Sequence, residues 1–437
     1  ISRRVIIEFT LGSTMAALRI PAIGLICILL VSILSPITSA ESAVELENPI
    51  WIAEMDLGLE ALASGGENSQ KIIVAGADGY ARLIDGENPS EQIDLATPVD
   101  STLRAIDWHP RGKTALLAGD NGAMLRYATE DHSVTTVSGS SQLGSLDMRG
   151  VAWNAAGNWA YIGGEDGWIW AYQEGEGGIG NFQLIISEEG SFVTGIACLN
   201  EVNVCAVSTE SDGIALIDSR TEHTVHWIGS ENRLWRGVSC DGGPLERCVA
   251  IGDGKGIGSI TLNLENLDQS TIFTQIVPEV SGELTHVHAR TTGELLISMA
   301  PFQIVAWDMG EVEAYGWVEH EDVMSNSSAL AGERLIGTWA TTADENTGFI
   351  VTSYGGIIGF HPPAESSVWT DSLISYILGA VVLVAVPGVI LGLIFMNSET
   401  LQRIYFARRN AKHEALETAR IQKEKDAKRA ARKKKSA

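Results

Sequence analysis

One pattern recurs along most of this 437-residue chain: a short apolar run, a glycine turn carrying an acidic or amide residue, and a second apolar run. The turn glycines lie 43, 45, 46 and 43 residues apart, at Gly79, Gly122, Gly167, Gly213 and Gly256. Asp-Gly or Asn-Gly between apolar runs favours a tight hairpin, because such turns need positive φ. Flanking runs such as "TALLAG" and "AMLRYA" are typical of strands, and two looser repeats follow near Phe302 and Gly356.

A period near 45 residues with about four strands per repeat is typical of a β-propeller. We therefore predict an all-β, seven-bladed propeller over residues 41–366, in which each four-stranded sheet buries its faces against its neighbours. The last repeat contains only three predicted strands. The segment "PIWIAEM", residues 49–55, is expected to supply the fourth strand of that blade and so to close the ring.

The repeats resemble those of the WD-repeat and related propeller families. The residues that carry the resemblance are Trp108 and Trp153 at the end of the innermost strand, the Asn/Asp/Gly turns after them, and hairpins of the "GGEDG" type. The resemblance covers roughly residues 49–362 and implies the fold rather than an activity. The chain lacks the Gly-His opening of that family, and its only Trp-Asp close is at Trp307.

Two apolar segments are predicted to enter a membrane. Residues 1–14 precede Met15 and are expected to lie upstream of the true start. Residues 15–40 combine an arginine, an apolar run and the small-residue site Thr38-Ser39-Ala40, as in a cleaved secretory signal; an uncleaved anchor is the alternative. Residues 372–397, "SLISYILGAVVLVAVPGVILGLIFMN", are uncharged and long enough to cross a bilayer.

The charge is divided unevenly between the two sides of this predicted span. Residues 398–437 carry thirteen Lys/Arg and five Asp/Glu, whereas residues 41–371 carry fourteen Lys/Arg and forty-nine Asp/Glu. Basic residues just after the span favour a cytoplasmic tail and an exterior propeller. A surface this acidic is unsuited to nucleic acid. The basic, helix-forming tail is expected to contact anionic lipid, with an acidic cytoplasmic partner as the alternative.

Four cysteines fall in the fourth and fifth repeats. Aligned with "VAWNAAGNWAYIGG", Cys198 and Cys240 occupy the position of Trp153, and Cys205 and Cys248 the position of Ala160. The members of each pair should therefore face each other across a hairpin, which favours Cys198–Cys205 and Cys240–Cys248 disulfides. Disulfides indicate an oxidising compartment. A metal site is the alternative, although the spacings are unusual for zinc.

One repeat position is rich in arginine. Four residues before the Trp/Cys position, each blade presents a residue near the expected mouth of the central channel, and from the second to the seventh blade these are Arg104, Arg149, Thr194, Arg236, Thr285 and Leu335. Converging guanidinium groups suit a carboxylate, sulfate or phosphate. Trp235, beside Arg236, would add an apolar rim. The alternative is that each arginine pairs with an Asp or Glu of the neighbouring blade or stacks on a tryptophan.

Catalytic motifs are absent: the chain has no Gly-x-Ser-x-Gly, no His-Glu-x-x-His and no phosphate-cradling loop before a helix. His286 and His288 share one strand face, but a packed or solvated pair is favoured over a metal site. No cofactor is predicted. Asn326, in "NSS", is the one glycosylation sequon and is expected in a loop.

These features predict a single-pass membrane protein that displays a propeller outside the cytoplasm. We expect a binding platform for a protein, peptide or glycan rather than an enzyme, and the layout resembles that of archaeal surface proteins. The alternatives are a lyase or hydrolase acting on saccharide or phosphoester, and a scaffold subunit of an envelope or secretory-pathway complex. In a eukaryote, Lys434 and Lys435 would resemble a dilysine signal for retention in the endoplasmic reticulum.

Overall fold

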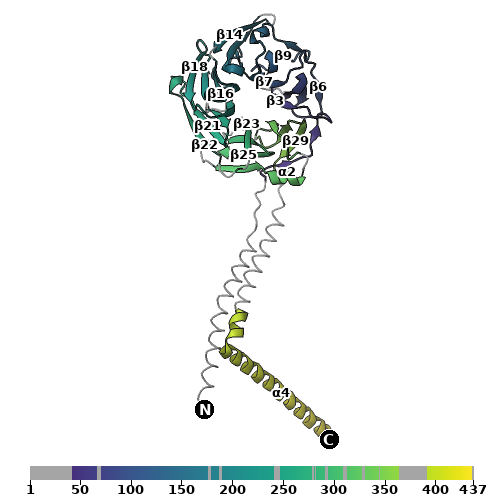
Figure 1. Ribbon diagram of the computed structural model, residues 1–437. Coiled ribbons are helices and arrows are strands. Elements are labelled where there is room, and N and C mark those ends of the chain that lie inside the picture. Colours follow the sequence, from purple (N-terminus) through teal and green to yellow (C-terminus); the bar gives the residue numbers. More distant parts are fainter. Residues whose placement is uncertain are drawn as a thin grey trace, which may run out of the picture. The chain divides into compact units, whose positions relative to one another are not determined.

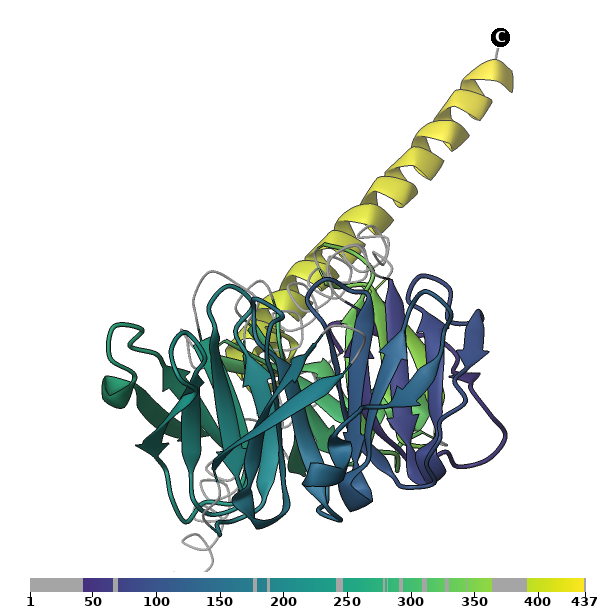
Figure 2. The ribbon, with the colours of Figure 1, turned by 90° about the horizontal axis from the view of Figure 1, so that it is seen from above.

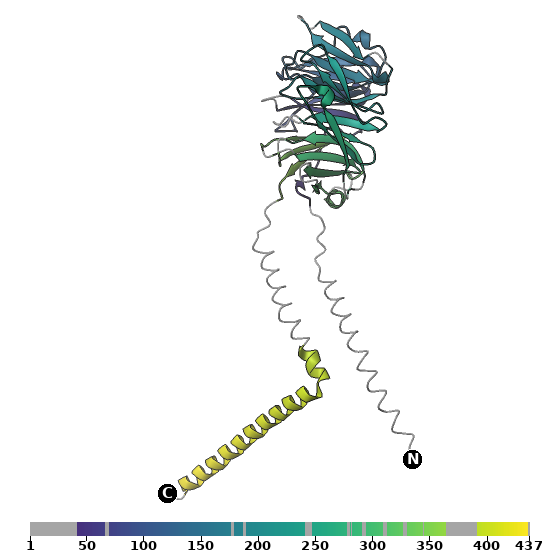
Figure 3. The ribbon, with the colours of Figure 1, turned by 90° about the vertical axis from the view of Figure 1, so that its left-hand side faces the viewer.

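The computed structural model describes residues 42–65, 70–175, 179–186, 189–240, 247–277, 280, 282–290, 294–308, 313–326, 330–343, 345–363 and 391–435. The chain divides into two compact units, Ile1–Pro362 and Pro363–Ala437. The first unit is the all-β, seven-bladed propeller that the repeats predict, with seven antiparallel sheets placed around a central axis (Figure 1). Figures 2 and 3 show the same sheets from the sides of the ring.

Each blade is a four-stranded meander, numbered outward from the central channel. Blade 1 contains β3 (Leu59–Ser64), β4 (Lys71–Gly76), β5 (Ala81–Asp85) and β6 (Gln92–Asp94). Blade 2 contains β7 (Leu103–Trp108), β8 (Thr114–Gly119), β9 (Met124–Ala128) and β10 (Val134–Thr136). Blade 3 contains β11 (Met148–Trp153), β12 (Ala160–Gly164), β13 (Ile169–Glu174) and β14 (Gly180–Ile186).

The next three blades repeat this order. Blade 4 contains β15 (Val193–Cys198), β16 (Val204–Thr209), β17 (Ile214–Asp218) and β18 (Thr224–Gly229). Blade 5 contains β19 (Trp235–Cys240), β20 (Arg247–Gly252), β21 (Gly256–Thr261) and β22 (Thr271–Ile276). Blade 6 contains β23 (Glu283–Ala289), β24 (Glu294–Ala300), β25 (Gln303–Asp308) and β26 (Glu313–Val318).

Blade 7 takes strands from both ends of the propeller. β27 (Leu335–Ala340), β28 (Gly348–Thr352) and β29 (Gly356–His361) come from the last repeat, and both β1 (Glu45–Leu46) and β2 (Ile50–Trp51) pair with β29. The predicted closure is therefore correct, although the closing strand is split around Pro49 and reaches back to Glu45. Proline has no N–H to donate and interrupts the ladder. Blade 7 then packs on blade 1 through apolar residues such as Ile336 and Leu59 (Figure 1).

The repeated glycine turns join the second and third strands of their blades, and in blade 6 the corresponding turn, Pro301–Phe302, has no glycine. In the short 3-10 turns η1 (Ala77–Gly79), η2 (Asp120–Gly122) and η4 (Glu165–Gly167), the second and third residues have positive φ. This is the conformation that Asp-Gly and Asn-Gly favour. In blade 5 the positive-φ residues are Gly254 and Lys255, and Gly256 already begins β21. These turns lie at the end of the ring where the innermost strands begin, since Leu103 pairs with Gly119.

The described residues of the propeller include three further helical segments. They are the 3-10 helices η3 (Ser140–Leu143) and η6 (Leu267–Gln269) and the α-helix α2 (His320–Asn326). Asn326, the sequon residue, is therefore the last residue of a short helix rather than a loop residue. Two acidic residues in the first turn, Glu321 and Asp322, favour this helix by opposing the positive end of its dipole.

The second unit contains α4 (Glu399–Lys435), a long and exposed helix. Ser398 precedes it, and the Ser398 hydroxyl accepts a hydrogen bond from the Leu401 N–H, as an N-cap does. Among the residues that the structure describes, no helix combines the length and hydropathy needed to span a bilayer. The predicted signal, residues 15–40, and residues 372–390 of the predicted span lie outside the described part.

Candidate functional site

All seven innermost strands contain the same irregularity. The register shifts after the first residue in six of them and after the second residue in β23. Each shift leaves one extra residue, a β-bulge, near the end of the ring where the glycine turns lie. A bulge re-aims the side chain of the extra residue. The seven bulged residues all line the central channel: Glu60, Arg104, Arg149, Thr194, Arg236, Thr285 and Ile336.

The repeat position singled out in the sequence is this bulge, with two differences. In blade 7 the prediction of Leu335 is wrong: Leu335 is buried and Ile336 is the bulged residue. The predicted position lies four residues before the tryptophan of each strand or the residue aligned with it. Trp339 is the penultimate residue of its strand, whereas Trp108 and Trp153 are the last residues of theirs, so the position in blade 7 is shifted by one. Glu60 was missed because blade 1 has no tryptophan at that end. A pattern of apolar residue, bulged residue, then Ala or Gly would have found both.

Two of the predicted arginines are already paired with carboxylates. Arg104 donates two hydrogen bonds to Asp120, at 2.5 and 2.8 Å, and these bonds, more than any other interaction, raise the pKa of Arg104 above its usual value. Arg236 lies 2.7 Å from Asp253 and 3.0 Å from Glu283. Both Asp120 and Asp253 belong to turns between second and third strands, so each arginine ties its inner strand to its own turn.

A fourth arginine, which the sequence did not single out, also lines the channel. Arg334 forms an ion pair with Glu60 at 2.9 Å, and Arg104 lies 4.0 Å from the same carboxylate. These contacts join blades 7, 1 and 2 across the ring closure. The wall therefore presents paired charges of both signs over this part of the mouth.

Arg149 differs from the other three. Its side chain is exposed, its Cζ lies 4.4 Å from the ring centroid of Phe192, and it forms no ion pair with any residue that the structure describes. Stacking on an aromatic ring uses the face of a guanidinium and leaves its N–H edge free to donate. Arg149 is thus the free cation of the described channel wall.

Trp235 does not form an exposed rim. It is fully buried, and its indole N–H donates to the Ser230 carbonyl at 3.1 Å. Trp235 occupies the first position of β19, which corresponds to Leu103 and Met148 in blades 2 and 3. It therefore shapes the channel wall by packing behind the surface, while the neighbouring Arg236 reaches the lumen.

The channel encloses about 540 Å³. His286 follows the bulged Thr285 of blade 6, and its side chain is exposed only toward this lumen, so protein surrounds it. That surrounding protein lowers the pKa of His286 to about 4, and the charge of nearby His288 contributes less. The imidazole is consequently neutral near pH 7. In the described residues no group of three or more His, Cys, Asp or Glu could hold a metal ion.

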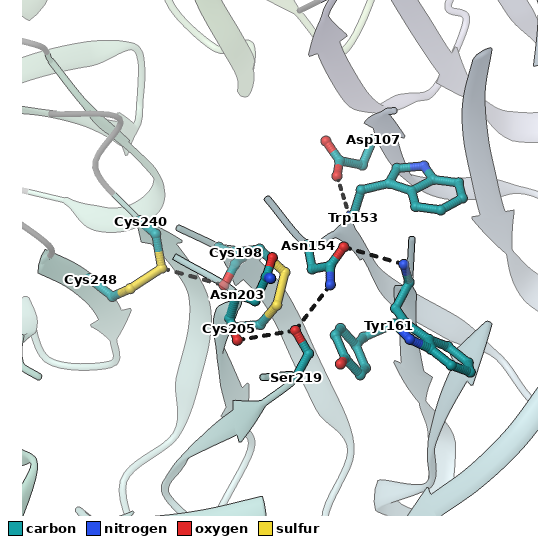
Figure 4. Close-up of a disulfide and its surroundings, with 12 residues drawn as sticks. Asp107, Trp153, Asn154, Tyr161, Cys198, Asn203, Cys205, Ser219, Cys240 and Cys248 are labelled. Atoms are coloured by element: carbon teal, nitrogen blue, oxygen red, sulfur yellow. Dashed lines mark hydrogen bonds between the residues drawn. A yellow bond between two sulfur atoms is a disulfide. The ribbon is translucent and has the colours of Figure 1, made fainter. Parts of the chain in front are cut away.

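At the other end of the innermost strands, the two predicted disulfides are confirmed. Cys198–Cys205 and Cys240–Cys248 each join two residues that face each other on the first and second strands of a blade, with Cα separations of 3.9 and 4.0 Å (Figure 4). The metal alternative for these cysteines is therefore wrong. Cys198 and Cys240 occupy the strand position that Trp108 occupies in blade 2. Trp108 links blade 2 to blade 1 by donating its indole N–H to the Ala63 backbone carbonyl.

Hydrogen bonds connect the hairpins around the first disulfide. Asn154 donates from its amide to the Ser219 hydroxyl at 3.1 Å, and Ser219 donates to the Asn203 carbonyl at 3.0 Å (Figure 4). The Asp107 carboxylate accepts a hydrogen bond from the backbone N–H of Trp153 at 2.6 Å, which links blades 2 and 3. Burial raises the pKa of Asp107 to about 7, against the opposing effect of the backbone hydrogen bonds that it accepts. These hydrogen bonds link neighbouring blades at this end of the ring.

Comparisons with known proteins agree on the fold. No protein-family model and no curated protein matches the chain. The structure is similar to that of YCF48 from Cyanidioschyzon merolae, at 14% identity and a TM-score of 0.53, covering 74% of this chain and 99% of that one. It is also similar to the Cps50 (Swd1) β-propeller domain of Myceliophteria thermophila, at 12% identity and a TM-score of 0.56, covering 72% and 99%. At these identities the likeness concerns the fold alone.

Proposed function

We propose that this protein is a membrane-tethered binding platform whose propeller docks a partner protein on the channel-mouth face. The observation that carries the proposal is the ring of seven bulged residues, which aims charged and polar side chains into one opening. A rigid ring with variable side chains at its loop end is a common way to present a binding surface.

The pairing of charges favours a protein partner over a free anion. Arg104, Arg236 and Arg334 are each matched by a carboxylate, so the three arginines first predicted to bind one anion do not act as a unit. An opening that alternates positive and negative groups can match the similarly mixed surface of a protein.

The last strand of the propeller leads away from this face. β29 runs away from the mouth, because Gly356 follows the turn at the mouth end and His361 pairs with Glu45 at the opposite end. The described propeller thus ends, at residue 363, away from the mouth. Its first described residue, Ser42, instead contacts Glu319 and Asp322 in the connection between β26 and β27.

Export to an oxidising compartment is the second part of the proposal. Both disulfides support it, since such bonds persist outside the cytoplasm. Residues 15–40 would direct export, residues 372–397 would span the membrane and residues 398–437 would lie in the cytoplasm against anionic lipid. The membrane is the cell membrane, or that of the endoplasmic reticulum if the source is eukaryotic.

Site-directed photocrosslinking in cells that produce the full chain tests the docking face. A crosslinking residue replaces Glu210, which lines the channel, and in a second variant replaces Arg111, which is exposed at the opposite end of β7. We expect a discrete crosslinked partner from position 210 and none from position 111. Crosslinking from position 111 alone would place the docking surface elsewhere and overturn the proposal.

Protease treatment of intact cells tests the topology. With an epitope after Ala437, external protease should digest the propeller and leave a small membrane-bound fragment that carries the epitope. Loss of the epitope without permeabilisation, or full protection of the propeller, would contradict the predicted orientation. Carbonate extraction should leave the chain in the membrane pellet.

A further inference from the structure

The central channel has the dimensions of a ligand pocket. Its volume of about 540 Å³ falls within the range of roughly 300–1,000 Å³ that is usual for sites that enclose a ligand. It opens at the face proposed for docking, so a short segment of a docked partner could enter it. A ligand of that size is a few residues of peptide rather than a folded domain.

The wall of the channel is layered. The bulged residues, all polar except Ile336, form the outer layer, and deeper in the channel lies an aliphatic layer made of Leu62, Ile106, Val151, Ile196, Val238 and Val287. Between them comes the residue that directly follows each bulge, and six of the seven are small: Ala61, Ala105, Gly150, Gly195, Gly237 and Gly337. A ligand that enters therefore meets charge first and apolar surface last.

His286 is the exception in the small-residue layer. At some of these positions the neighbouring strand leaves no room, since a Cβ on Gly150 would lie 2.7 Å from Ile196 and one on Gly195 would lie 3.3 Å from the Gly237 Cα. In blade 6 the histidine instead projects into the lumen with its surface exposed there. Packing does not require an imidazole at this position, because the other blades do without one.

A second polar group beside His286 lacks a partner. The hydroxyl of Thr285 is buried and makes no hydrogen bond in the structure. The equivalent hydroxyl in blade 4, that of Thr194, is paired with Ser208 at 2.9 Å. Buried hydroxyls are normally hydrogen-bonded, so the unpaired Thr285 hydroxyl is an unusual feature of the wall next to His286.

We propose that the channel binds a peptide segment of the docked partner that carries one carboxylate next to an aliphatic side chain. The free N–H edge of Arg149 donates to the carboxylate, the aliphatic side chain enters the deeper apolar layer, and His286 hydrogen-bonds the peptide backbone. A C-terminal aliphatic residue carries both groups on one Cα and fits these layers best. With a single free guanidinium, the site matches one negative charge rather than a phosphate dianion. This inference rests on the proposed docking function.

Fluorescence polarisation with the full chain in detergent tests the proposal. The probe is a fluorescein-labelled pool of hexapeptides with five randomised residues and a C-terminal leucine that has a free carboxylate. Two comparison pools have the same leucine as an amide, or an internal Glu-Leu pair in an amidated peptide. We expect the free-acid pool to bind at least about tenfold more tightly than the amide pool. Tighter binding of the Glu-Leu pool would keep the carboxylate chemistry and assign it to a side chain.

Variants locate the binding in the channel. Arg149→Met should weaken the free-acid pool by about tenfold or more, and Arg149→Lys should do so less, because it keeps the charge but loses the forked edge. His286→Ala installs the residue type of other blades and should weaken binding several-fold while leaving the protein folded at neutral pH. Arg111→Met removes an equal charge at the opposite end and should leave binding unchanged.

Two results would overturn the inference. One is equal binding of the free-acid and amide pools, or no binding of any pool. The other is unchanged binding by Arg149→Met while its unfolding temperature equals that of the wild type. The crosslinking experiment separates this failure from failure of the docking proposal. A partner that is still crosslinked at position 210 in the Arg149→Met variant would support docking on this face while rejecting the peptide site in the channel.

Discussion

Arg290 shows how a single residue can fasten two blades. It lies at the end of β23, with 3% of its surface exposed, and it contacts Glu294 at 3.0 Å within blade 6. It also contacts Glu345 at 3.2 Å and Asn346 at 2.9 Å, both in the loop between β27 and β28 of blade 7. The buried guanidinium is thus matched by two carboxylates and an amide.

Replacing this arginine with methionine should be strongly destabilising. Arg290→Met leaves Glu294 and Glu345 close together without their counter-charge, and breaking a buried ion network costs about 3–5 kcal/mol. Urea unfolding followed by tryptophan fluorescence would measure the loss. The exposed Arg111→Met should change stability by less than about 0.5 kcal/mol. Similar values for the two variants would show that the buried network contributes little.

His286 should make the propeller sensitive to mild acid. Because its pKa is lowered from the ordinary 6.5 to about 4 in the folded state, the unfolded chain binds the proton first as pH falls. The stability that the neutral imidazole contributes is present above pH 6.5 and is lost between pH 6.5 and 4. Relative to His286→Ala, the wild type should lose unfolding temperature over that window. A constant difference between the two proteins would contradict the lowered pKa, which a direct NMR titration would also test.

The position of a residue in the fold could be predicted where its repeat aligns with another repeat. Aligning the blades placed both cysteine pairs across their hairpins and placed Arg104, Arg149 and Arg236 at the channel. The count failed in blade 7, where Trp339 occupies a shifted position and Ile336 takes the bulge. Pairing with a carboxylate of a neighbouring blade was one expectation from the sequence, and Glu60 and Glu283 fit it. The closer partners, Asp120 and Asp253, lie in the same blade as their arginine and were not predicted, because the bulge sets the direction of each arginine.

At the scale of elements, the closing strand is the part on which the ring depends most. Ala43 donates from its N–H to the Trp317 carbonyl at 3.1 Å, and Ser42 hydrogen-bonds to Asp322 through its N–H at 3.0 Å and through its hydroxyl. Val44 is buried among Trp317, Phe360 and other residues of blades 6 and 7. The repeat pattern predicted the closure but not this clamp, since residues 42–46 carry no strand signal.

Removal of this segment should open the ring. Deleting residues 42–52 leaves one edge of β29 and the apolar residues beneath it exposed, so unfolding should lose cooperativity and blade 7 should become sensitive to protease. The single change Val44→Asp buries an unpaired carboxylate and should act in the same direction with the backbone intact. Limited proteolysis with mass spectrometry identifies the first sites cut. First cuts in blades 2 to 4 would show that the closure is not the weak point.

At the scale of the whole molecule, charge sets a condition for stability. Residues 41–371 carry forty-nine Asp/Glu and fourteen Lys/Arg, and the mouth ion pairs neutralise only a few of them. The compact state is therefore opposed by repulsion between its own carboxylates. Raising NaCl from about 0.01 to about 0.5 M shortens the screening length several-fold and should raise the unfolding temperature. KCl should act equally; a flat or falling temperature would show that local ion pairs outweigh the net charge.

The ring closure also fixes the order of events when the chain is made. Ser42 and Asp322 are 280 positions apart, and the partner strand of Glu45 ends at His361. A chain that emerges from its amino end therefore exposes its closing strand first and must keep it unpaired while every blade is synthesised. Contacts between such distant positions form slowly, and unpaired edges are prone to wrong association in the meantime. The first strand to be synthesised is the last to pair. Until it does, the nascent propeller is an open arc whose first and last blades both expose unpaired strand edges.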